Sequence, residues 1–340
     1  MVEFMLLAYN WRSIMTLWTE AETPFLYHPY TARKGIALES LVRRVAFTVI
    51  LFAFLEDTLN FISAYKLNEL HIEHCPHASS FWYNFFRREH HHIMRFVPYH
   101  PVLGVAIETT MRVAKFTWNY TDVFITSVCL TLLRRFQQFN DRIERFAGIE
   151  QPQVVWREVR LDFLRLNDLV DFLDGKLSRI ILMSCANNMF FISVQLYNIF
   201  DLKPIQSTTI YYWYSLLFVM SRCFIMLYVT SSVYEESLRP LKLLRIFPTL
   251  SWNLDLQRLV DHVSMKRIAF SGKRFFFITR PLILAVDYFC TTKHCSIENK
   301  SISFTDGRNN YYLRVSSVGS SGQRQRYYTG LQLLNRNKIY

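Results

Sequence analysis

The sequence predicts an all-α protein whose helices cross a membrane several times, and three observations support this fold class. Hydrophobic residues make up 51% of the 340 residues, whereas glycine and proline number only 9 and 10. This composition argues against a turn-rich β fold and against a disordered chain. The mean hydropathy is nevertheless only +0.09, because the charged residues cluster between strongly apolar stretches. Such clustering is typical of a polytopic transmembrane helix bundle.

Four stretches approach the roughly 20 apolar residues that a membrane-spanning helix needs. They are residues 45–64, a segment within 109–132, residues 180–200 and residues 209–233. Two further stretches, residues 4–9 and 275–290, are apolar but short. The sequence therefore predicts about four full spans together with a partial first and a partial last span.

The basic residues orient these spans, because cytoplasmic loops carry an excess of Lys and Arg. The N-terminal region and loops 134–179 and 234–274 together carry 22 Lys and Arg, against 5 in loops 65–104 and 201–208. We therefore expect the three basic regions in the cytoplasm and the other two loops outside, with the protein in the plasma membrane. The basic residues flank apolar spans, so the net charge of +12 indicates a membrane-lipid environment and no nucleic-acid partner.

The cytoplasmic loops are expected to extend the spans as helices. Residues 156–177 carry apolar side chains at helical spacing and continue into the third span, with only Gly175 as a mild break. Residues 134–146 continue the second span, and residues 253–262 form a further amphipathic helix. Long helices of this kind suggest an assembly domain, although solvated helix ends would need no oligomer.

Two groups of titratable residues resemble candidate sites but have simpler interpretations. Seven histidines have the close spacing of metal ligands, yet all lie in the one loop 65–104, so we expect surface histidines and no metal. They are His71, His74, His77, His90, His91, His92 and His100. The acidic residues of the helix 156–177 are expected on a salt-bridged, solvated surface. They are Asp162, Asp168, Asp171 and Asp174. No phosphate-binding loop or nucleophile motif is present, so neither an enzyme nor a cofactor is predicted.

Polar side chains within the spans predict a polar cavity inside the bundle, because a charge that faces lipid is costly. The first span contains Glu56, Asp57 and Asn60. Carboxylate, amide and aromatic groups together suit a sugar, whose hydroxyls form hydrogen bonds and whose C–H face packs on rings. The residues expected to bind the ligand are Arg112, Trp118, Asn119, Asp122, Asn188, Tyr212 and Trp213. Two alternatives are charge pairs that only hold the bundle together and an interfacial aromatic belt at residues 211–214.

Seven ordered motifs resemble those of the insect gustatory receptors, and most closely the sugar-receptor branch. They are FWYNFFRRE (81–89), FTWNYTD (116–122), LRRFQQFNDRIE (133–144), SCANNMFFISVQLYN (184–198), YYWYSLLFVMSR (211–222), DLQRLVDHV (255–263) and AFSGKRFFFITR (269–280). The resemblance implies seven spans with a cytoplasmic N-terminus. It also implies a homo- or hetero-tetramer with other gustatory receptors, which forms a ligand-gated cation channel in taste neurons. The sugar would lie in the outer half of each subunit, the last span would line the pore, and cytoplasmic helices would assemble the tetramer.

The resemblance covers roughly residues 8–285 and departs from the family at both ends. Family members begin with two spans before the region that matches residue 8. At the other end, Asp287 enters where the pore helix should continue, and a polar segment without periodicity follows. We therefore expect a transmembrane domain over residues 1–286, a disordered tail over 287–340, and no conduction by the chain as written.

Two other function classes stay open at this point. A secondary transporter of a small polar solute is the main alternative, because charges inside a membrane also mark transport paths. The chain shows no internal repeat and no broken, glycine-rich helices, which argues against a transporter. A membrane enzyme that uses the histidine loop is the third class, and stoichiometric iron or zinc in the purified protein would favour it.

Overall fold

The computed structural model describes residues 2–30, 37–74, 80–146, 149–201, 206–245 and 253–285. These ranges are dominated by α-helices, and the one strand-like pairing within them is an isolated bridge between Ser271 and Phe277. The predicted all-α class is therefore confirmed. The polar tail predicted over 287–340 lies outside the described residues.

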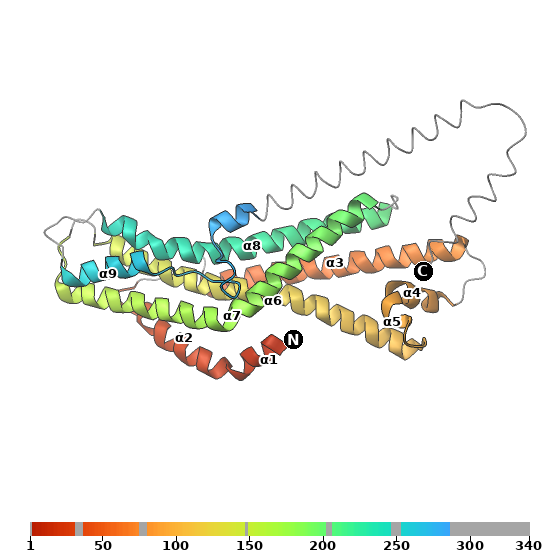
Figure 1. Ribbon diagram of the computed structural model, residues 1–340, viewed down its shortest axis with the longest axis horizontal. Helices are drawn as coiled ribbons and strands as arrows, with labels where there is room; N and C mark the ends of the chain where they lie inside the picture. The colour runs from red at the N-terminus through yellow and green to blue at the C-terminus, as the bar shows by residue number, and fades with distance from the viewer. Residues whose placement is uncertain are drawn as a thin grey trace, which may run out of the picture. The chain divides into compact units, whose positions relative to one another are not determined.

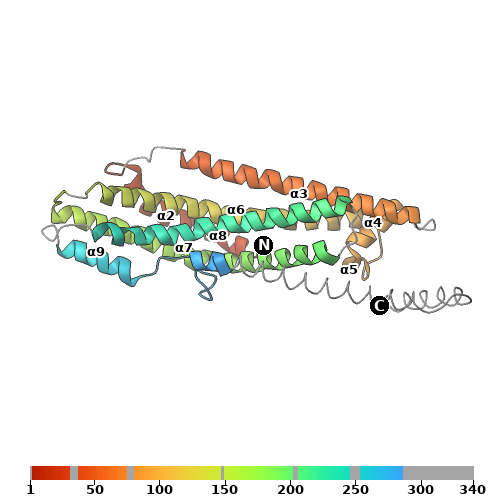
Figure 2. The same cartoon turned by 90° about the horizontal axis from the view of Figure 1, so that it is seen from above.

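In the described part of the chain, four long helices form the bundle, five shorter named helices pack around it, and a further helical segment begins at residue 280. The long helices are α3 (Leu38–His74), α6 (Pro101–Glu144), α7 (Gln153–Asp201) and α8 (Gln206–Leu244). The shorter helices are α1 (Val2–Tyr9), α2 (Trp11–Leu26), α4 (Phe81–Glu89), α5 (His91–Met94) and α9 (Leu254–Met265). Helices α6, α7 and α8 lie side by side, α3 packs on α6 and α8, and α9 packs on α7 and α8 (Figures 1 and 2).

Among the described residues, three helices are long and apolar enough to cross a membrane, namely Leu38–Glu73, Gln153–Ile199 and Thr209–Leu244. They contain three of the four predicted spans, which confirms a membrane protein. The remaining predicted span lies in α6, where Arg112, Lys115 and Asp122 interrupt the apolar sequence.

Helices α6 and α7, which contain most of residues 134–179, are much longer than a bilayer is thick. Helices α6 and α7 contain 44 and 49 residues. At a rise of about 1.5 Å per residue they measure roughly 66 and 74 Å, against a hydrocarbon thickness of about 30 Å. The predicted helical extensions are therefore confirmed as continuous helices, and Gly175 does not break α7.

The N-terminal half of α7 buries its apolar stripe against α2, α6 and α9. Every apolar position predicted in residues 156–177 is buried in one core cluster. These positions are Val159, Phe163, Leu166, Leu169, Val170 and Leu173. The Phe163 ring packs against Phe136 and Phe139 of α6, with ring centroids 6.4 and 5.5 Å apart. Packing of this stripe holds the ends of α6 and α7 that adjoin residues 145–152 together with α2 and α9.

The expectation of a solvated acidic surface on α7 is wrong for Asp162. Its side chain is buried, accepts a hydrogen bond of 2.7 Å from the Tyr30 hydroxyl and pairs with Arg142 and Arg165 at 3.3 and 2.7 Å. Asp162 lies three residues after Val159 and four before Leu166, so the helix period places it on the same buried face. Asp168 is exposed, as expected.

Helix α9 begins at a side-chain cap and is joined to α7 by a carboxylate. The Asn253 side chain accepts a hydrogen bond of 2.9 Å from the Leu256 backbone N–H, which satisfies a free donor at the helix start. Asp255 accepts hydrogen bonds from Gln153 at 3.1 Å and from Arg160 at 3.2 Å. These two hydrogen bonds hold the pKa of Asp255 below its usual range.

The stretch predicted as a short last span over 275–290 does not begin as a helix. Residues 271–277 form a tight turn closed by the bridge between Ser271 and Phe277. Lys273 and Arg274 adopt left-handed backbone angles, with φ of 53° and 62°. Asp174 of α7 accepts hydrogen bonds from the Ser271 backbone and hydroxyl at 2.6 and 2.9 Å and so anchors the turn. Helix begins only at residue 280 and continues to 285, the last described residue.

Candidate ligand-binding site

A cavity of about 320 Å³ lies between α3, α6 and α8, and we call it the inner cavity. Its volume is at the lower end of the range for small-molecule sites, about 300–1,000 Å³. Its polar lining residues are Glu56, Asp57, Asn60, Arg112, Lys115 and Asn119. Its aromatic lining residues are Phe54, Phe116 and Tyr211. Charged, amide and aromatic groups therefore face the same small space.

The carboxylate of Glu56 is held in place from α8 and α7. The Ser215 hydroxyl donates to Glu56 Oε1 at 2.5 Å, and the Gln195 amide donates to the Ser215 oxygen at 2.9 Å. This chain of hydrogen bonds fixes one oxygen of Glu56, so the carboxylate is preorganised before a ligand arrives.

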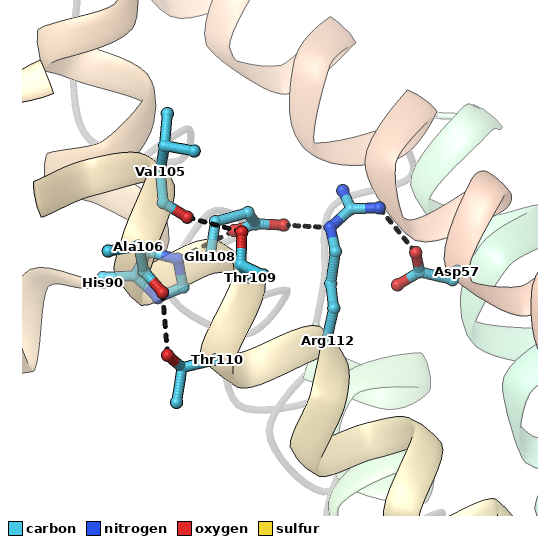
Figure 3. Close-up of polar contacts among 8 residues, drawn as sticks. All are labelled: Asp57, His90, Val105, Ala106, Glu108, Thr109, Thr110 and Arg112. Atoms are coloured by element: carbon cyan, nitrogen blue, oxygen red, sulfur yellow. Dashed lines mark hydrogen bonds and ion pairs between the residues drawn. The ribbon is translucent and has the colours of Figure 1, made fainter. Parts of the chain in front are cut away.

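A second chain of polar contacts links Asp57 and Arg112 of the inner cavity to Glu108 and His90, and Figure 3 shows these contacts. The Arg112 guanidinium lies between two carboxylates, with Nη1 2.6 Å from Asp57 on α3 and Nε 2.9 Å from Glu108 on its own helix. The other oxygen of Glu108 lies 2.9 Å from Nε2 of His90. The expectation of a surface histidine is therefore wrong for His90, whose side chain is buried against this carboxylate.

A second cavity of about 250 Å³, the outer cavity, lies between α3, α4 and α6. Its lining includes Asn60, Arg112 and Lys115, which also line the inner cavity. The groups that belong to the outer cavity alone include Phe61, Ala64, Phe85, Glu89, His90, His92 and Glu108. The two cavities are therefore neighbours with a shared wall.

A buried polar cluster joins α6, α7 and α8. Asp122 lies 2.8 Å from Arg222 Nε in an ion pair, and the Asn188 amide donates to Asp122 at 3.0 Å. Ser184 also donates to Asp122. The Asn188 carbonyl accepts hydrogen bonds from Trp118 at 3.2 Å and from Arg222 at 3.0 Å. The ionic side chains are almost fully enclosed, with 1% of Asp122 and 5% of Arg222 exposed.

The structure divides the seven predicted ligand residues into three groups. Arg112 and Asn119 line the inner cavity, and Arg112 also lines the outer one. Trp118, Asp122 and Asn188 belong to the buried polar cluster and line neither cavity. Tyr212 and Trp213 line neither cavity, and 46% of Trp213 is exposed on the outside of α8. That any of the seven residues contacts a ligand stays a prediction.

The inner cavity also contains residues that the sequence did not single out as ligand residues. Glu56, Asp57 and Asn60 come from α3, and Tyr211 precedes the predicted tyrosine and tryptophan by one and two positions. The sequence contains a signal for Glu56, Asp57 and Asn60, because carboxylates and an amide inside an apolar span indicate a polar interior of the bundle. No comparable signal separates Tyr211 from its aromatic neighbours.

Several helices that can span a membrane and a polar cavity between them define a polytopic membrane protein of the receptor or transporter class. Residues 1–292 match the sequence family described as "Trehalose receptor". The chain belongs to this family, which consists of receptors rather than enzymes. The match includes the region over which the gustatory-receptor motifs were found, so that resemblance is confirmed.

Curated relatives from Drosophila melanogaster are similar over most of the chain. "Gustatory receptor for sugar taste 64a" is 31% identical over 84% of this chain, and "Gustatory receptor for sugar taste 61a" is 30% identical over 82%. "Gustatory receptor 5a for trehalose" is 24% identical over 84% of this chain. The chain spans 63%, 64% and 63% of the lengths of these three relatives.

Solved structures of an insect olfactory receptor share the fold. The receptor OR5 from Machilis hrabei aligns with a TM-score of 0.57 at 11% identity, over 87% of this chain and 76% of its own. Its complex with eugenol aligns with a TM-score of 0.56 at 10% identity, over 83% of this chain and 74% of its own. At these identities the likeness concerns the fold alone.

Proposed function

We propose that this chain is a gustatory receptor for sugars and that it binds its ligand in the inner cavity. The observation that carries the proposal is the lining of that cavity. Glu56, Asp57 and Asn60 offer acceptors and donors for vicinal hydroxyls, while Phe54 and Phe116 offer apolar ring faces. The names of the relatives at 30–31% identity, which are receptors for sugar taste, support the same ligand class.

We further propose that the chain lies in the plasma membrane, with loops 65–104 and 201–208 outside. The charge asymmetry of the loops supports this orientation. In it, the inner cavity lies in the outer half of the bundle, because residues 53–60 precede loop 65–104 and Tyr211 follows loop 201–208. A sugar would then enter from the external solution.

The proposed signalling role is that of a subunit of a ligand-gated cation channel, assembled as a homo- or hetero-tetramer with other gustatory receptors. The fold shared with an insect olfactory receptor and the long helical extensions of α6 and α7 support this role. The extensions offer a broad helical surface for assembly on the cytoplasmic side.

The test is direct detection of sugar binding by the purified full chain in lipid nanodiscs. Saturation-transfer NMR suits weak ligands, and the sugars are glucose, fructose, maltose and sucrose. Asn60→Ala is expected to weaken binding about three- to tenfold, because it removes hydrogen bonds of about 0.5–1.5 kcal/mol. Thr109→Ala is the matched control, since this exposed hydroxyl of α6 donates to the Val105 carbonyl and lines neither cavity. Equal losses in both variants, or no saturation transfer to any of the four sugars, would refute the proposal.

A further inference from the structure

Three residues, Asn60, Arg112 and Lys115, line both cavities and form the wall between them, and Arg112 is held at two points. Arg112 contacts both cavities, and its guanidinium bridges Asp57 of α3 and Glu108 of α6 (Figure 3). The Phe61 ring lies on the outer side, with the guanidinium carbon 5.4 Å from its centroid. Arg112 therefore spans from α6 to α3 at the level where the cavities meet, beside Asn60 and Lys115.

The two cavities follow one another along the same pair of helices. Residues 53–60 of α3 and 112–119 of α6 line the inner cavity, while residues 60–64 and 108–115 line the outer one. With a helical rise of about 1.5 Å per residue, the centres are displaced by roughly 6–8 Å along the bundle. The displacement points toward loop 65–104, the proposed external side. A ligand longer than one sugar ring would reach from the inner cavity into the outer one.

The lining of the outer cavity has the same mixture of groups as that of the inner cavity. Glu89 and His92 supply polar atoms, and the rings of Phe61 and Phe85 supply apolar faces, with centroids 6.0 Å apart. Such a lining suits the hydroxyls and the C–H face of a further ring.

The Arg112 side chain is well placed to leave the wall. Its exposed fraction is 39%, that of its partner Asp57 is 28%, and both side chains line the inner cavity, so this ion pair is not sealed within the protein. Partly exposed ion pairs contribute little net stability, because solvation replaces most of the lost attraction. By contrast, Glu108 stays in place when Arg112 moves, since His90 holds its other oxygen.

We propose that the outer cavity is a second binding subsite, which takes the far ring of a sugar with two or more rings when Arg112 moves out of the shared wall. This inference rests on the proposed sugar-binding function of the inner cavity. Arg112 is then a specificity-determining residue, because the position of its side chain sets the longest ligand that fits.

The experiment compares dissociation constants for one-ring and two-ring sugars on the full chain in nanodiscs. The sugar pairs are glucose with maltose and fructose with sucrose. Saturation-transfer NMR measures the dissociation constant of each sugar. Arg112→Ala joins the cavities and is expected to shift the affinity ratio toward the two-ring sugar by up to about fivefold. A partly exposed ion pair contributes at most about 1 kcal/mol, and this free energy corresponds to about a fivefold change in affinity. Arg95→Ala, an exposed arginine that lines neither cavity, should leave the ratio unchanged.

A second variant acts in the opposite direction and does not depend on Arg112. Ala64 lines only the outer cavity, so Ala64→Leu fills that space and leaves the inner lining intact. It should weaken binding of the two-ring sugar, spare the one-ring sugar, and cancel the gain that Arg112→Ala produces. If the affinity ratio is unchanged in both variants, the outer cavity is not a second subsite. If the parent chain still binds one-ring sugars in that case, the proposed sugar-binding function stands. Absence of binding of all four sugars to the parent chain overturns both.

Discussion

Removal of the Asp122 carboxylate should destabilise the protein strongly without removing a ligand contact. Asp122→Ala leaves the Arg222 charge enclosed and unpaired, in a site where 5% of that side chain is exposed. Breaking a buried ion pair in this way costs about 3–5 kcal/mol. In the double variant Asp122→Ala/Arg222→Met the stranded charge is gone. The remaining cost should be about 1–3 kcal/mol, because Ser184 and Asn188 each lose an acceptor.

The assay is reversible unfolding of the purified chain in mixed micelles, followed by tryptophan fluorescence. Asp168→Ala is the control for loss of a carboxylate at an exposed position of α7, and it should change stability by less than about 0.5 kcal/mol. Sugar binding by the folded fraction of Asp122→Ala is measured in parallel. A loss of stability below about 1 kcal/mol together with a loss of sugar binding would refute the structural role. It would instead make Asp122 the ligand contact that the sequence predicts.

Three further outcomes follow from other parts of the structure. The pKa of Asp255 is lower in the folded than in the unfolded chain, so its stabilisation is complete above about pH 4 and is lost as the pH falls through the folded value. Hydrogen exchange of α9 should therefore quicken at acid pH in the parent chain, and Asp255→Asn should remove this pH dependence. Tyr211→Ala should weaken sugar binding about three- to tenfold, whereas Trp213→Ala, outside both cavities, should change it by less than about twofold. Phe163→Ala should cost about 3–5 kcal/mol in the same unfolding assay, because the ring is fully buried; a cost below about 1 kcal/mol would contradict the described core.

The helical architecture could be predicted because the sequence contains two patterns, each typical of one environment of a helix. Runs of apolar residues mark what lipid surrounds, and the 3.6-residue stripe of Val159, Phe163 and Leu166 marks what other helices cover. The same stripe could have revealed the burial of Asp162, which lies three residues after Val159 and four before Leu166. The turn over 271–277 could not be predicted from apolar content, because it depends on a hydrogen-bonded contact with Asp174, which lies 97 positions away.

The lining of the inner cavity follows less directly from the sequence, because helix rotation decides which neighbouring residues share a cavity. Asn119 and Trp118 are adjacent in sequence, yet one lines the inner cavity and the other contacts Asn188 in the buried cluster. Likewise Tyr211 lines the cavity while Trp213 faces outward, since successive residues turn by about 100°. Polarity and depth give the level of a residue in the bundle but not the direction of its side chain.

The same physics separates two kinds of charge inside this bundle. Asp122 and Arg222 are sealed from water, so each depends on the other, and exchange of either partner for a ligand would leave a buried charge unpaired. Arg112 and Asp57 keep 39% and 28% of their side chains exposed and both line the inner cavity, so we expect a hydroxyl or water in that cavity to replace either partner at small cost. We therefore expect a ligand to contact Arg112 and Asp57, and we expect the enclosed pair of Asp122 and Arg222 to hold α6 and α8 together. On this argument, the exposure of an ion pair, rather than its position within a span, is what predicts a binding role.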